Sequence, residues 1–305
     1  MPDIKIMATG LGFPEGPVWM ADGSVILGEI SGKKVTRVAA DGAKTEIGKA
    51  GGGPNGVATG PDGALHVCNN GGAVYETTPS FLSTGPALDY KGGSIQRIDP
   101  KTGETKTLYS ECNGHKLSAP NDLVFDKQGG FYFTDLGKRY ARHRDHGGVY
   151  YALSDGSKVS EIAYPVLSPN GCALSPDEKV LYVADTEPAR LWAFDIETPG
   201  VLKKHGFPSP HGGRLVAGLA GFQRFDSIAV MASGNICVAT LTTGCITVIS
   251  PAGDVKKQVK VPDVYPTNIC FGGADLRTAY ITLSDEGQLG VMQWDEPGLK
   301  LNYAA

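Results

Sequence analysis

Six short segments of the chain each begin in a turn with one oxygen-bearing side chain and continue as an apolar strand. They start FPEGPVW, GPNGVAT, APNDLVF, SPNGCAL, FDSIAVM and PTNICFG, and the six side chains are Glu15, Asn55, Asn121, Asn170, Asp226 and Asn268. Taken singly, each residue is typical of a solvated or capping position. Taken together, carboxylates and amide carbonyls are the ligands that a hard cation such as Ca²⁺ prefers, and two carboxylates neutralise its charge. The recurrence therefore predicts one divalent metal site.

The spacing of the six segments predicts the fold that would bring them together. A repeat of roughly 40–50 residues with several short strands per unit is typical of a β-propeller. Asp-Gly and Ser-Gly turns separate the strands, and no long segment shows helical periodicity. We expect an all-β, six-bladed β-propeller that forms a single domain over residues 1–305. The leading IKIMATG would add an outer strand to the last blade, close the ring and remove a free sheet edge.

Two insertions and one glycine-rich stretch carry no further site in this interpretation. The excess between Asn55 and Asn121 is rich in Gly, Ser and Thr, which predicts a long loop over one face. His143 and His146 lie in KRYARHRDHGG with no Cys or further His nearby, so a surface loop is favoured over a zinc site. Gly51–Gly56 has nucleotide-loop spacing, but Pro54 and the following strand exclude a helix start. No motif of a nucleophilic hydrolase is present.

Composition excludes several classes of partner. The 305 residues have a net charge of −4 and a pI near 5.9, which favours neither nucleic acid nor an anionic membrane surface. No apolar run approaches the ~18 residues that span a bilayer, and no leader peptide is visible, so we expect a cytoplasmic protein. The six scattered cysteines are expected to be reduced core thiols. Whether Cys237 and Cys245 pair across a hairpin is left open, as is the oligomeric state.

Four longer stretches carry a resemblance beyond the polar positions: FPEGPVW, PNDLVFDKQGGFYFTD, SPNGCALSPDEKVLYVADT and PTNICFGGADLRTAYIT. Over essentially the whole chain they resemble the SMP-30/gluconolactonase/LRE-like family of six-bladed propellers. The middle two are particularly similar to Drp35-type bacterial lactonases. The resemblance implies a metal-dependent hydrolase that opens a small lactone at the central mouth, with Ca²⁺ the first choice of ion and Zn²⁺, Mn²⁺, Mg²⁺ and Fe²⁺ left open.

The resemblance also assigns residues. The positions of the family's metal ligands are held here by Glu15, Asn121, Asn170 and Asp226, with Ser227 at an auxiliary position. Asp226 also matches the acid/base, which would take a proton from water and return it to the leaving alkoxide. Ala119 stands where sugar lactonases have an Arg that grips hydroxyls or a carboxylate, which puts a typical aldonolactone substrate in doubt. Substrate-site candidates are Asn55, Asp122, Arg139 and Asn268, with Arg139 replacing the missing charge.

Two other functions stay open at this point. A calcium-dependent organophosphate or ester hydrolase would polarise its substrate in the same manner at the same site. A non-catalytic propeller that serves as a binding module is the second alternative, and it gives no reason for Glu15, Asn121 and Asp226 to share one phase of the repeat.

Overall fold

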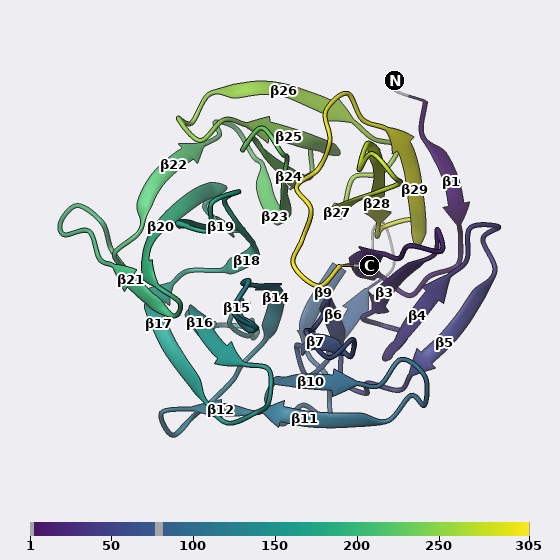
Figure 1. Ribbon diagram of the computed structural model, residues 1–305. Coiled ribbons are helices and arrows are strands. Elements are labelled where there is room, and N and C mark those ends of the chain that lie inside the picture. Colours follow the sequence, from purple (N-terminus) through teal and green to yellow (C-terminus); the bar gives the residue numbers. More distant parts are fainter. Residues whose placement is uncertain (1–2, 77–81, 305) are drawn as a thin grey trace.

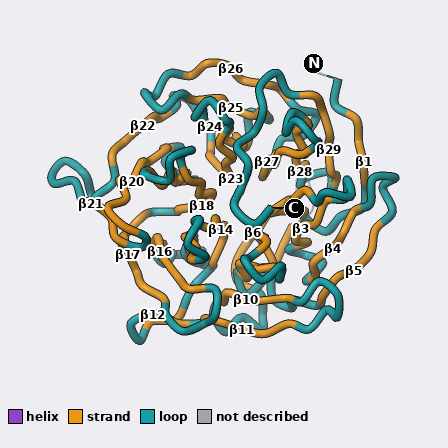
Figure 2. Tube along the Cα trace, in the orientation of Figure 1, coloured by secondary structure: helices purple, strands orange, loops and turns teal. Residues whose placement is uncertain are grey.

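The computed structural model describes residues 3–76 and 82–304, and this part of the chain is all-β with no helix (Figure 2). Six antiparallel sheets surround a central axis like the blades of a propeller (Figure 1). The predicted six-bladed propeller is confirmed. No helix of the described residues is long and apolar enough to cross a membrane.

The strands run outward from the axis in each blade. The first three blades are β2 Pro14–Trp19, β3 Val25–Glu29, β4 Lys34–Val38 and β5 Lys44–Gly48; β6 Pro54–Thr59, β7 Leu65–Asn69, β10 Ser94–Ile98 and β11 Thr105–Tyr109; and β14 Pro120–Phe125, β15 Gly130–Asp135, β16 Gly147–Leu153 and β17 Val159–Val166. The other three are β18 Pro169–Leu174, β19 Val180–Asp185 and β20 Arg190–Thr198, followed by both β21 Val201–Lys203 and β22 Arg214–Gly218; β23 Arg224–Val230, β24 Ile236–Leu241, β25 Cys245–Ile249 and β26 Val255–Lys260; and β27 Pro266–Gly272, β28 Thr278–Leu283, β29 Gln288–Gln293 and β1 Lys5–Ala8.

Both ends of the described chain contribute to the ring. The innermost strands contact one another in the order β2, β6, β14, β18, β23 and β27, and β27 contacts β2 again. At the N-terminus, β1 pairs antiparallel with β29, with Lys5 opposite Val291. The last blade is therefore assembled from residues at opposite ends of the sequence.

Hydrophobic clusters between neighbouring blades hold the ring together. In one of them, Ile26 and Val35 of the first blade pack with Leu65 and Val67 of the second, and all four are at most 1% exposed. Alternate residues of β3 point to the opposite face, where Val25 and Leu27 pack against the sixth blade. Full burial of each such side chain contributes about 1.5–3 kcal/mol, so the seams between blades stabilise the fold.

Every innermost strand contains one extra residue at the same place. In β2, Glu15 lies opposite Gly28 and Val18 opposite Ile26, so three steps along β2 match two along β3. The same irregularity occurs near the start of the other five innermost strands. A bulge of this kind turns a side chain out of the regular pleat. Here it sits beside the six polar positions identified in the sequence.

The C-terminal segment crosses the ring and ends near its centre (Figure 1). The Leu299 amide donates to the Val230 carbonyl in the fifth blade, at 2.9 Å. Asn302 Nδ2 donates to the Phe125 carbonyl at 3.1 Å, and the Tyr303 hydroxyl donates to the Lys127 carbonyl at 3.0 Å. These contacts tie turns of the fifth and third blades to the sixth.

Three details refine the sequence-based expectations. The insertion before the third blade contains a hairpin, β8 Ala73–Glu76 with β9 Leu82–Pro86, and residues 77–81 lie outside the described part. A smaller hairpin pairs β12 Glu111–Cys112 with β13 His115–Lys116. All six cysteines are free; Cys237 lies opposite Val248 and Cys245 opposite Thr240, so the hairpin register keeps the two thiols apart.

Candidate functional site

One mouth of the ring is a polar cavity of about 210 Å³. Its central lining comes from the residue next to the bulge in each innermost strand. These six residues are Glu15, Asn55, Asn121, Asn170, Asp226 and Thr267. The structure thus brings together five of the six side chains singled out in the sequence, and it adds Thr267.

Asn268 lies one residue deeper than its sequence pattern suggested. Thr267 follows Pro266 at the start of β27, as Glu15 follows Pro14 at the start of β2, so Thr267 is the equivalent residue. The Asn268 amide donates from Nδ2 to Glu15 Oε2 at 3.2 Å. Asn268 therefore orients the carboxylate of Glu15 from below.

The next position along the innermost strands is glycine in three blades and a polar residue in the other three. In ring order these residues are Gly16, Gly56, Asp122, Gly171, Ser227 and Asn268. A Cβ on Gly171 would lie 2.7 Å from the Ser227 carbonyl carbon, so glycine lets these neighbouring strands approach.

The polar members of this deeper layer support the residues at the mouth. Ser227 is fully buried and its hydroxyl donates to Asn170 Oδ1 at 3.3 Å. Asp122 Oδ1 accepts from the Leu123 amide at 2.9 Å, and Asp122 does not line the mouth cavity. Asp122 and Ser227 thus lie behind the ligand candidates rather than beside a ligand in the mouth.

Two buried carboxylates face the same cavity, and each disfavours ionisation of the other. Burial, the charge of Asp226 and the charge of Asp122 together hold the pKa of Glu15 well above its usual range. Burial likewise raises the pKa of Asp226 to about 7, although Arg224 and Asn170 act in the opposite direction. Uncompensated carboxylates in this setting are costly, and a bound cation is one way to relieve that cost.

Two of the three amide oxygens of the site also lack partners. Asn55 Oδ1 and Asn121 Oδ1 are buried and accept no hydrogen bond from the described residues. Buried acceptors are normally satisfied, so these two atoms point to a partner that the protein itself does not supply. Two carboxylates and several amide oxygens form a donor set that fits a hard divalent cation. Among residues 3–76 and 82–304, no cluster of three or more His, Cys, Asp or Glu side chains could hold a metal ion, so an ion in the mouth would depend on the amide oxygens as well as on the two carboxylates.

The wall of the mouth contains basic residues that the repeat pattern did not identify. Arg139 lines the cavity, and its backbone forms an isolated β-bridge with Arg144 on the insertion between β15 and β16. Arg144, Lys138 and Arg224 line it as well. Arg224 stands two residues before Asp226 and was detectable in the sequence, whereas the positions of the other two depend on how the insertion folds.

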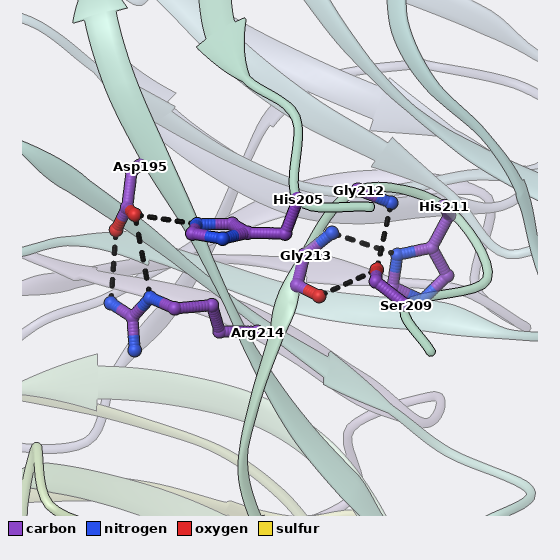
Figure 3. A network of polar contacts seen from close by, with 7 residues as sticks. All are labelled: Asp195, His205, Ser209, His211, Gly212, Gly213 and Arg214. Carbon is purple, nitrogen blue, oxygen red and sulfur yellow. Dashed lines mark hydrogen bonds and ion pairs between the residues drawn. The ribbon is translucent and has the colours of Figure 1, made fainter. Parts of the chain in front are cut away.

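A separate polar network on the fourth blade does not resemble a nucleophilic centre (Figure 3). His205 Nε2 lies 2.7 Å from Asp195 Oδ2, and Arg214 donates to the same carboxylate at 2.9 Å. Ser209 donates its hydroxyl to the Gly213 carbonyl at 2.7 Å rather than to a histidine. No Ser–His–Asp relay is formed, and these residues hold together the loop between β21 and β22.

A second cavity, of about 330 Å³, lies at the other end of the ring axis. It is lined by the downstream ends of the innermost strands, including Val230 and Phe271, and by Leu299 and Leu301 of the C-terminal segment. Asp122 and Asn268 reach this cavity rather than the mouth. Its mostly apolar walls offer few groups for chemistry.

Comparison with known proteins places this geometry in a family. The sequence profile described as SMP-30/Gluconolactonase/LRE-like region matches residues 13–285. The chain belongs to this family. One family relative, a lactonase drp35 from Staphylococcus haemolyticus, is 31% identical over 86% of this chain and 73% of its own length. A gluconolactonase from Zymomonas mobilis is 25% identical over 92% of this chain and 79% of the relative.

Solved structures of similar fold agree with this assignment. A gluconolactonase from Xanthomonas campestris superposes with a TM-score of 0.74 at 24% identity, covering 95% of this chain and 89% of that one. A calcium-binding protein, regucalcin, from Agrobacterium tumefaciens gives a TM-score of 0.72 at 16% identity, with 97% of both chains covered. At these identities the similarity establishes the fold alone.

Proposed function

We propose that the protein is a divalent-metal-dependent lactonase that works at the polar mouth of the ring. The observation that carries the proposal is the meeting of two buried carboxylates with unpartnered amide oxygens in one small cavity. The lactonase and gluconolactonase relatives support the reaction class. The regucalcin neighbour, described as calcium-binding, supports the choice of ion.

The proposed metal ligands are Glu15, Asn121, Asn170 and Asp226, and Ser227 would support Asn170 through its hydrogen bond to Oδ1. When bound, the ion would act as a Lewis acid toward the lactone carbonyl, and Ca²⁺ suits an all-oxygen donor set best. Asn268 keeps Glu15 oriented through its hydrogen bond. Asn55, whose Oδ1 is free, would accept a hydrogen bond from a substrate hydroxyl.

Asp226 is the proposed acid/base. Its carboxylate would remove a proton from the attacking water as the new C–O bond forms at the lactone carbonyl. The same proton would then pass to the ring oxygen as the acyl–oxygen bond breaks, which leaves a hydroxy acid. Burial raises the pKa of Asp226 to about 7 in the absence of an ion, and a bound cation would lower it, so the carboxylate would be ionised and able to accept the proton at neutral pH.

The proposal is tested with protein stripped by EDTA and resupplied with one ion at a time, assayed on a panel of five- and six-membered lactones. With metal at saturation, Asp226→Asn should lower turnover by about 10²–10⁴-fold, because general acid–base catalysis contributes this much. Asn121→Asp keeps an oxygen and adds a charge, so it should tighten the metal and change turnover less.

Asp195→Asn, on the fourth-blade network outside the mouth, is the matched control for a lost carboxylate. A metal-saturated Asp226→Asn protein with wild-type turnover would overturn the catalytic assignment. An ion that binds at the mouth with no hydrolysis of any lactone or ester would indicate a binding module instead.

A further inference from the structure

The lining of the mouth is positively charged once the metal site is set aside. Lys138, Arg139, Arg144 and Arg224 line the cavity, together with three carboxylates. Two of these carboxylates, Glu15 and Asp226, are the proposed ion ligands, and a divalent cation matches their charge. Glu187 is then the remaining acid in the lining. This local excess of positive charge stands out in a chain whose net charge is −4.

Two of the four basic side chains are only partly neutralised. Glu187 Oε1 accepts from Arg224 Nη2 at 2.8 Å and lies 3.5 Å from Arg144 Nη1, so one carboxylate serves two guanidinium groups. The Nε atoms of Arg144 and Arg224 are buried and have no hydrogen-bond partner among the described residues. A buried donor on a charged group costs free energy when it makes no hydrogen bond, and an anion in the mouth would accept hydrogen bonds from these two atoms.

The other two basic residues differ in what they can offer. The Lys138 ammonium is already engaged, since it donates to the Asn70 and Gly72 carbonyls at 2.6 and 2.7 Å. Arg139 is exposed at the rim, and within residues 3–76 and 82–304 its guanidinium forms no ion pair. Arg139 is therefore available to a ligand, and Lys138 is structural.

Ala119, two residues before Asn121, contributes no charge to the mouth. It lines the cavity and is 3% exposed, and its amide donates to Asp135 Oδ1 at 2.7 Å. The basic groups come instead from the insertion between β15 and β16 of the same blade and from the first residue of β23 in the fifth blade. The third and fifth blades therefore supply the basic part of the lining.

We propose that the lactone taken by this site carries an anionic substituent, a carboxylate or a phosphate ester, which binds Arg144 and Arg224 with Arg139 at the rim. This inference rests on the proposed lactonase function. The guanidinium fork matches both kinds of anion in geometry. The cavity of about 210 Å³ has room for a small ring that carries such a substituent.

The test compares lactones with the same ring that carry no charge, a carboxylate or a phosphate ester, using metal-loaded protein. The value of kcat/KM should be about tenfold or more higher for at least one anionic lactone than for the neutral one, because charge-assisted hydrogen bonds are the strong ones. Comparing the two anionic lactones identifies the preferred group. The preference should also shrink as salt is raised, since exposed charges are screened.

Variants locate the effect. Arg144→Gln and Arg139→Gln should each reduce the ratio of kcat/KM between anionic and neutral lactones, and Arg144→Lys should retain part of it. Arg97→Gln removes a surface guanidinium paired with Asp62 outside the mouth and should leave the ratio unchanged. Equal kcat/KM for charged and neutral lactones, or a ratio that Arg144→Gln does not move, would overturn the inference while leaving the lactonase proposal intact.

A binding measurement separates the two proposals when no lactone is turned over. Calorimetry would then titrate inorganic phosphate and a small dicarboxylate into the metal-loaded protein and into Arg144→Gln. Binding that depends on Arg144 would support the anion site although the lactonase function had failed. Binding unaffected by the substitution, or none, would overturn the anion site as well.

Discussion

Removing the ion should expose an unusual dependence of stability on pH, to which the buried carboxyl groups of Glu15 and Asp226 both contribute. The contribution of Asp226 can be sized from its carboxyl group. This group is 7% exposed, and burial raises its pKa from 3.8 to about 7 in the folded protein. Between these two values the unfolded chain has released the proton and the folded chain still holds it. The free energy of unfolding therefore falls as pH rises through this window and levels off above the folded pKa.

The size of the effect follows from the shift. Each pKa unit corresponds to about 1.4 kcal/mol, so a shift of roughly three units amounts to about 4 kcal/mol over the whole window. Between about pH 5 and pH 7.5 the metal-free protein should lose roughly 2–3 kcal/mol of stability from this group. Added Ca²⁺ should reverse the trend, because the ion favours the ionised carboxylate and binds more tightly as pH rises.

Urea unfolding in EDTA at several pH values measures this effect, with Asp226→Asn as the comparison. The variant lacks the titrating group. As pH rises from 5 to 7.5, the unfolding free energy of the wild type should therefore fall relative to that of the variant by roughly 2–3 kcal/mol. Distant groups such as His66, whose pKa is lowered by burial, titrate in both proteins and largely cancel. Glu15 does not cancel, because the charge of Asp226 raises its pKa only in the wild type, and this moves the difference further in the same direction. A difference that stays constant from pH 5 to pH 7.5, or moves the other way, would refute the reasoning.

Three further outcomes are expected. Glu15→Gln should weaken Ca²⁺ binding about tenfold or more in calorimetry, because it removes one of two neutralising charges; unchanged affinity would exclude Glu15 as a ligand. Gly171→Ala should lower stability by about 1–3 kcal/mol in urea unfolding, because the new methyl group collides with the Ser227 backbone, whereas Gly206→Ala meets open space and should change little. Removing residues 1–9 takes β1 from β29 and should lower the melting temperature by several degrees, and an unchanged value would show that β1 contributes little.

The repeat was sufficient to predict the fold and most of the mouth, because spacing and strand alternation are local properties of the chain. In the last blade, the repeat pattern placed the mouth residue one position too far along the strand. The segment PTNICFG carries two oxygen-bearing residues in succession, and the pattern alone favoured Asn268 over Thr267. The bulge decides between them, and a bulge is specified by pairing with the neighbouring strand rather than by the residue types.

The basic wall of the mouth was beyond the reach of the repeat pattern for a different reason. Arg144 belongs to an insertion that is not part of the repeat, so its place follows from tertiary contacts such as the donation to the Leu136 carbonyl at 3.0 Å. Glu187 lies just after β19, and the sequence around it is typical of an ordinary surface turn. Only the folded ring brings it against Arg224.

Because each innermost strand has its extra residue at the same place, each blade contributes one side chain to the centre of the mouth. In chain order these side chains are Glu, Asn, Asn, Asn, Asp and Thr. The apolar residues of the same strands pack between the blades, away from the mouth. Substituting one of the six side chains therefore alters one wall of the site and leaves the hydrophobic contacts between blades unchanged. A ring built in this way can acquire a new substrate or a new ion through one or two point changes. The same scaffold is then a ready starting point for redesigning the chemistry of its mouth.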